Sequence, residues 1–131
     1  GKITNYRNNI TILDGAHNLD SSYELNKYLN KKEMGKWNLI IGMLKNRDIK
    51  DFVKIFRSHI HNVFAISIPQ ADTSYSKDEI AFNLKGLGLK VNPALDLENA
   101  LKLADRDAPL LITGSLYLAG HTLKFNETKI D

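Results

Sequence analysis

Short apolar runs rich in β-branched residues alternate with amphipathic segments along most of this chain. The apolar runs cover residues 10–14, 38–43, 63–68, 89–94 and 109–113. An i, i+3, i+4, i+7 spacing of apolar residues, which places side chains on one face of a helix, occurs at Ile49, Phe52, Val53 and Phe56 and again at Leu97, Ala100, Leu101 and Ala104. Apolar strands that alternate with helices predict a parallel sheet covered by helices on both faces.

Local sequence patterns predict where the helices begin and which strand lies at one edge of the sheet. Ser21-x-x-Glu24 and Ser76-x-x-Glu79 are typical of capping boxes, and Asp96 is a suitable N-cap before Leu97. The leading segment 2–7 is followed by an Asn-Asn turn, which predicts an edge strand antiparallel to the first core strand. The predicted class is therefore α/β: a Rossmann-like three-layer sandwich with about six mostly parallel strands, one antiparallel edge strand, and helices on both faces.

Composition favours one soluble globular domain over the whole of 1–131. The chain is 43% hydrophobic and 25% charged, and no apolar run approaches the roughly 20 residues that span a membrane. Its net charge of +3 is scattered rather than clustered, which disfavours nucleic-acid binding. The absence of cysteine excludes disulfides and fits a cytoplasmic protein. No metal site is predicted: His59 and His61 lack the helical zinc-site spacing, and with His121 we expect them at the surface.

Several polar residues follow predicted strands directly. Asp14 and His17 come after the first core strand, Lys45 after the second, and Ser115 and Tyr117 after the last. The carboxyl ends of parallel strands share one edge of the sheet, where open α/β sheets bind ligands, so we expect these residues to converge there.

The chemistry of these residues suits a nucleotide and an acid, although each has a structural alternative. Asp14 can accept hydrogen bonds from a ribose diol, and His17 can meet a phosphate or a reacting acyl group. Ser115 at a helix N-terminus suits a carboxylate, and Lys45 suits a phosphate or a carboxylate. Equally, Asp14 can serve a turn, Ser115 can cap a helix, Tyr117 can pack on the sheet and Lys45 can be a surface lysine.

Three motifs in order resemble those of one enzyme family. Residues 13–18 (LDGAHN) are similar to the signature of folylpolyglutamate synthases and dihydrofolate synthases, members of the Mur ligase superfamily. Residues 41–48 resemble the family's GMLxDKD segment, and residues 113–120 resemble its TGSLYLxGE segment. The resemblance covers the C-terminal domain of these enzymes, which implies that the chain is part of a longer ligase whose central ATPase domain is absent here.

The family joins L-glutamate to dihydropteroate or a folate by way of an acyl phosphate formed with MgATP. The resemblance implies that Asp14 holds the ribose and that His17 occupies a catalytic position near the phosphates or the bound acid. Gly1-Lys2 stands where the family commonly has Gly-Arg, so Lys2 is expected to contact the nucleotide through an ammonium. Ser115, Tyr117 and Lys45 are expected on the glutamate side.

No GxxxxGK[ST] phosphate loop occurs in the chain. In this family the loop and the magnesium ligands belong to the central domain, so we expect the present domain to be inactive by itself and to complete the ATP and glutamate sites on closure. Two alternatives are the same domain of another Mur ligase, acting on a cell-wall precursor, and a non-catalytic α/β binding module. Substrate choice, mono- or polyglutamylation and oligomeric state are not predicted.

Overall fold

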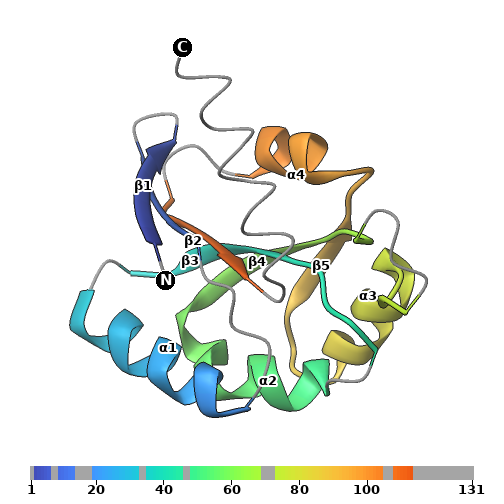
Figure 1. The fold of residues 1–131 in the computed structure, drawn as a ribbon, viewed down its shortest axis with the longest axis horizontal. Coiled ribbons are helices and arrows are strands. Elements are labelled where there is room, and N and C mark those ends of the chain that lie inside the picture. Colours follow the sequence, from blue (N-terminus) through green and yellow to red (C-terminus); the bar gives the residue numbers. More distant parts are fainter. Residues whose placement is uncertain are drawn as a thin grey trace.

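The fold is a six-stranded sheet with helices packed on both faces (Figure 1). The structure, a computed structural model, describes residues 2–6, 9–13, 19–32, 35–45, 48–68, 73–104 and 108–113, with backbone alone for the first two segments. The strands, in the order in which they lie in the sheet, are β1 (Lys2–Tyr6), β2 (Asn9–Leu13), β6 (Leu110–Thr113), β3 (Trp37–Ile41), β4 (Ile60–Ala65) and β5 (Lys90–Pro93).

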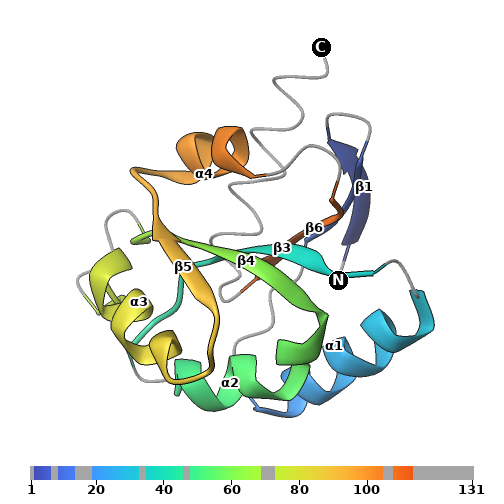
Figure 2. The same cartoon turned by 180° about the vertical axis from the view of Figure 1, so that it is seen from behind.

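All strand pairs from β2 to β5 are parallel, whereas β1 pairs with β2 in the antiparallel sense. Helices α1 (Leu19–Lys32), α2 (Ile49–Phe56) and α3 (Lys77–Lys85) lie on one face of the sheet, and α4 (Leu97–Leu103) lies on the other (Figures 1 and 2). A short 3-10 turn, Arg57–His59, leads from α2 into β4. The predicted α/β class, a parallel sheet with helices packed on it, is confirmed.

Each face of the sheet has its own hydrophobic core, because side chains alternate along a strand. In β3, Leu39 and Ile41 join the core beneath α1, α2 and α3, while Ile40 joins the core beneath α4. All five residues of β3 are buried, as expected for a central strand covered on both sides. The larger core includes an edge-to-face pair of Phe52 and Phe56, with ring centroids 5.3 Å apart.

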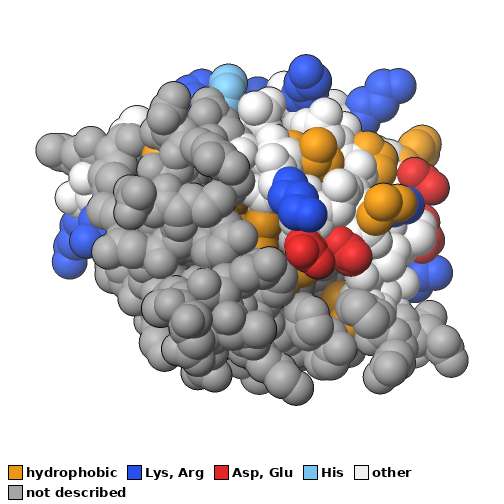
Figure 3. Space-filling model, turned by 90° about the horizontal axis from the view of Figure 1, so that it is seen from above, with side chains coloured by type: hydrophobic (Ala, Val, Ile, Leu, Met, Phe, Trp, Pro, Cys, Tyr) orange, Lys and Arg blue, Asp and Glu red, His pale blue; other side chains and the backbone are white. Residues whose placement is uncertain are grey.

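The described part of the molecular face on the α4 side has a mixed surface. Lys or Arg side chains lie close to Asp or Glu side chains there, with apolar side chains nearby (Figure 3). On α4, Lys102 pairs with Glu98 at 3.7 Å between nitrogen and oxygen.

Two of the predicted helix starts are confirmed. The Ser76 side chain accepts from the Glu79 N–H and the Glu79 side chain accepts from the Ser76 N–H, which completes a capping box at α3. The Asp96 side chain accepts from the Asn99 N–H at 2.8 Å and caps α4. Asp48 caps α2 in the same way, through the Asp51 N–H at 3.0 Å.

The predicted capping role of Ser21 is wrong. Helix α1 begins at Leu19, so Ser21 lies within its first turn. Asp20 also lies in that first turn, where a negative charge interacts favourably with the helix dipole. The helix therefore starts upstream of the Ser-x-x-Glu pattern.

The third core strand is shifted from its predicted range. The apolar run at 63–68 predicted it, but β4 spans Ile60–Ala65 because its register with β3 pairs Ile60 with Trp37 and Ala65 with Ile41. His61, which is exposed, interrupts the apolar pattern at the true start of the strand. Ile66 and Ile68 stay buried beyond the strand's end. In the part of the chain that the structure describes, no helix has the length and apolarity needed to cross a membrane.

Candidate functional site at the carboxyl edge of the sheet

The parallel strands end together along one side of the sheet, here called the carboxyl edge. Leu13 at the end of β2 lies opposite Ile112 of β6, and Ile112 lies opposite Ile40 of β3. The ladder continues from Ile41 to Ala65 of β4 and from Ala65 to Pro93 of β5. The segments that leave these strands therefore start from neighbouring points, as the prediction of a shared ligand edge requires.

The predicted site residues fall on this edge to different extents. Lys2, at the start of β1, lies opposite Leu13 in the antiparallel register, so its backbone lies beside the carboxyl end of β2. Asp14, His17, Ser115 and Tyr117 lie outside the described residues, and their roles stay predictions. Among the six residues predicted for the site, Lys45 is the one whose side chain the structure describes.

The segment that carries Lys45 is fixed by backbone hydrogen bonds. Leu44 forms an antiparallel bridge with Ser74. On either side of that bridge, the Lys45 N–H donates to the Thr73 carbonyl at 2.7 Å and the Tyr75 N–H donates to the Met43 carbonyl at 2.8 Å. The loop after β3 is thereby joined to the segment that leads into α3, which holds the Lys45 backbone at the carboxyl edge.

Gly42 lets the end of β3 and the segment after β4 approach closely. The Ile66 N–H donates to the Ile41 carbonyl at 3.0 Å, which brings the end of β4 against the end of β3. A Cβ atom at position 42 would lie 3.1 Å from the Ile66 carbonyl oxygen and 3.2 Å from Ile68 Cγ1. The absence of a side chain at Gly42 is therefore a packing requirement at the base of the Lys45 loop.

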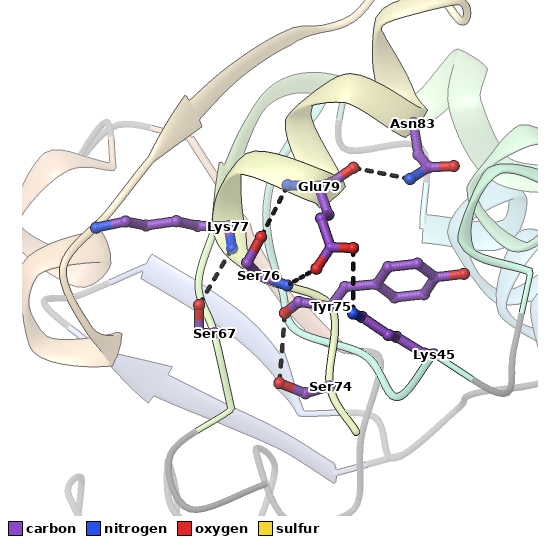
Figure 4. Close-up of polar contacts among 8 residues, drawn as sticks. All are labelled: Lys45, Ser67, Ser74, Tyr75, Ser76, Lys77, Glu79 and Asn83. Carbon is purple, nitrogen blue, oxygen red and sulfur yellow. Dashed lines mark hydrogen bonds and ion pairs between the residues drawn. The ribbon is translucent and has the colours of Figure 1, made fainter. Parts of the chain in front are cut away.

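The Lys45 side chain pairs with Glu79 in the first turn of α3 (Figure 4). Its Nζ lies 3.3 Å from Glu79 Oε2, while Glu79 Oε1 accepts the Ser76 N–H at 2.9 Å. The Ser76 hydroxyl in turn accepts the Glu79 N–H at 3.1 Å. One carboxylate thus caps the helix with one oxygen and binds the lysine with the other.

Electrostatics keep this carboxylate ionised. The backbone hydrogen bond from Ser76 and then the ammonium of Lys45 hold the pKa of Glu79 below its ordinary value, against a smaller opposing effect of burial. The Lys45 and Glu79 side chains are 50% and 45% exposed, so the pair borders solvent at the carboxyl edge. The arrangement can present a fixed ammonium to an anion.

The capping role of Glu79 was predicted from the sequence, but its contact with Lys45 was not. The Ser-x-x-Glu spacing indicates the local capping box, whereas the pairing with Lys45 depends on how β3 and α3 are arranged in space. A second contact between distant segments was also not predicted. The Ser67 hydroxyl accepts the Lys77 N–H at 3.1 Å and joins the segment after β4 to the start of α3 (Figure 4). Within the described ranges, no three His, Asp or Glu side chains are grouped closely enough to hold a metal ion.

Residues 2–125 match the sequence profile of a protein family described as the C-terminal domain of dihydrofolate synthetase. The chain belongs to this family. The predicted resemblance to the C-terminal domain of folylpolyglutamate and dihydrofolate synthases is thereby confirmed. Comparison with curated protein sequences gave no match.

Solved structures of folylpolyglutamate and dihydrofolate synthases show the same fold as this domain. Folylpolyglutamate synthase from Thermotoga maritima is 23% identical, with a TM-score of 0.84 over 98% of this chain and 30% of its own. A bifunctional folylpolyglutamate/dihydrofolate synthase from Yersinia pestis, complexed with AMPPNP and a Mn ion, is 20% identical, with a TM-score of 0.79 over 95% of this chain and 30% of its own. FolC from E. coli, in complex with DHPP and ADP, is 16% identical, with a TM-score of 0.83 over 99% of this chain and 31% of its own. The present domain thus spans a little under a third of the length of these enzymes.

Proposed function

We propose that this domain is the C-terminal part of an ATP-dependent ligase that adds L-glutamate to dihydropteroate or tetrahydrofolate through an acyl phosphate. The observation that supports this most is the family match over residues 2–125. The ligands of the structural neighbours, AMPPNP with Mn in one enzyme and DHPP with ADP in another, fit the same reaction. The domain's part is to complete the ATP and glutamate sites when it closes on its own central ATPase domain.

On the ATP side, the proposed contacts are Asp14, His17 and Lys2. Asp14 follows β2, where a carboxylate can accept two hydrogen bonds from a ribose diol. His17 is assigned a catalytic position near the phosphates, as the resemblance implies. The backbone of Lys2 lies beside the end of the same strand, which supports assigning Lys2 to the same ligand. In this scheme magnesium is bound with ATP by the central domain.

On the glutamate side, the proposed contacts are Ser115, Tyr117 and Lys45. The first two follow β6, which lies between β2 and β3 in the sheet, and Lys45 follows β3. A carboxylate between the ends of β6 and β3 would therefore be within reach of residues from both loops. Catalysis in this scheme is orientation and charge stabilisation rather than covalent chemistry by the domain. The proposed ligase acts in the cytoplasm and binds neither membrane nor nucleic acid.

The test is the steady-state kinetics of the complete ligase carrying Asp14→Ala. A strand-exit carboxylate that holds the ribose predicts a higher KM for ATP or a lower turnover, with an unchanged melting temperature. A large loss of melting temperature with intact kinetics would make Asp14 a turn residue and refute its assignment. Activity with a cell-wall precursor in place of a folate would favour another Mur ligase, and no ATP-dependent ligation with any acid acceptor would favour a binding module.

A further inference from the structure

We infer that Glu79 is a positioning residue for the glutamate-side lysine: it holds the Lys45 ammonium at the carboxyl edge so that the remaining N–H donors meet the substrate carboxylate. This inference rests on the proposed function, because it takes Lys45 to be a contact of the incoming glutamate. It adds a residue that no motif at the end of a strand indicates, since Glu79 lies on a helix.

Several contacts distinguish this pair from an isolated surface ion pair. Glu79 Oε1 is bound to the Ser76 N–H at 2.9 Å, which fixes the carboxylate in the helix cap. The other oxygen meets Lys45 Nζ at 3.3 Å (Figure 4). The Lys45 backbone is held independently through the Thr73 carbonyl at 2.7 Å. Both ends of the lysine side chain are therefore anchored, its Cα by the loop bridge and its Nζ by the cap.

The Lys45 ammonium retains N–H donors that can bind a ligand. An ammonium has three N–H donors, and the Glu79 carboxylate accepts from one of them. Half of the Lys45 side chain is exposed, so the other donors can reach a second carboxylate without breaking the first contact. A free lysine loses the entropy of four rotatable bonds when it binds an anion, and the tether reduces that loss in advance.

The experiment is a double-mutant cycle on the complete ligase with Lys45→Met, Glu79→Gln and both changes together. Glutamine at the same position preserves the capping box, because Gln serves as well as Glu there, but it removes the charge that holds the ammonium. We expect Glu79→Gln to raise the KM for glutamate about three- to ten-fold, the range set by immobilising one long side chain, with kcat and the KM for ATP nearly unchanged. We expect no further effect of Glu79→Gln in the Lys45→Met background.

Two variants serve as matched controls. Glu98→Gln makes the same chemical change in the exposed pair with Lys102 on α4, and should leave the KM for glutamate unaltered. Ser76→Ala removes the hydroxyl of the cap but leaves the lysine pair, so it should lower the melting temperature without raising the KM in proportion. Thermal melts of all variants identify any that are misfolded.

The outcomes separate this inference from the function on which it rests. If Lys45→Met leaves the KM for glutamate unchanged, Lys45 is no substrate contact, and both its assignment and the inference fail. If Lys45→Met raises that KM but Glu79→Gln leaves it unchanged or lowers it, the lysine acts without a tether and the inference alone fails. Additive effects in the double variant would also overturn it, because Glu79 would then act independently of Lys45.

Discussion

Gly42→Ala should destabilise the domain although it adds one methyl group to a residue of ordinary backbone conformation. The added Cβ would lie 3.1 Å from the Ile66 carbonyl oxygen and 3.2 Å from Ile68 Cγ1. Relief requires movement of the segment after β4, but the Ile66 N–H is bonded to the Ile41 carbonyl at 3.0 Å. Ile66 and Ile68 are 1% and 5% exposed, so neither can swing into solvent.

The expected cost is that of overpacking a well-packed core, about 1–2 kcal/mol of unfolding free energy. A domain of 131 residues loses roughly 4 °C in melting temperature per kcal/mol, so the expected decrease is about 4–8 °C. Because Lys45 follows Gly42 closely in the same loop, the displacement should also weaken its pairing with Glu79.

Gly86→Ala is the matched comparison. Its added Cβ would also be close to a neighbour, 2.9 Å from Lys50 Nζ, but that neighbour is the free end of a flexible side chain. Gly86 has φ −66°, which alanine adopts without strain, so the change should be neutral or stabilising by up to about 1 kcal/mol through the unfolded chain. Urea unfolding of both variants tests the difference. Equal stability of the two would refute the argument that the immobility of the contacted atom decides the cost.

Three further predictions concern the site and its charges. Ser115→Ala in the complete ligase should raise the KM for glutamate more than that for ATP; a loss of about 1 kcal/mol in stability with both KM values unchanged would identify a simple helix cap. The isolated domain should unfold cooperatively in urea but release no ADP in the presence of a folate, glutamate and MgATP, and measurable release would contradict its dependence on a central domain. Because the folded pKa of Glu79 lies below its ordinary value of 4.5, the stability it contributes is present above that value and is lost as the pH falls through the lowered pKa. Unfolding measured across this range should therefore show the wild type and Glu79→Gln converging in acid, and a constant difference would contradict the assignment.

Helix caps that depend on contacts between residues close in sequence were predicted from local patterns. The capping box at Ser76 and the N-cap at Asp96 each require contacts within three residues, so spacing alone was sufficient. Ser21 shows the limit of the same rule, since an identical spacing occurs inside a helix that begins at Leu19. Spacing shows where a capping box could form, whereas the packing of the whole helix determines the residue at which the helix begins.

Contacts between distant segments were not predictable in the same way. The start of β4 at Ile60 follows from its pairing with β3, and the polar residues His61 and Asn62 conceal it in the hydrophobic pattern. The pairing of Lys45 with Glu79 likewise needs the loop after β3 to lie beside the first turn of α3. The direction of the strands predicted the edge at which Lys45 lies, but not the partner of its side chain.

The close packing at Gly42 and the tether on Lys45 are parts of one arrangement. The segment after β4 packs against the end of β3, and its Ser67 hydroxyl accepts the Lys77 N–H at the start of α3, beside the Ser76 cap. The cap fixes Glu79, and Glu79 holds the lysine that emerges from the loop after Gly42. A methyl group at Gly42 should therefore act on Lys45 from both sides, through its own loop and through its partner. This predicts that Gly42→Ala raises the KM for glutamate in the complete ligase by more than its effect on the KM for ATP. An equal rise in the KM for glutamate and the KM for ATP would contradict this prediction, because the effect would then not be specific to the Lys45 side of the site.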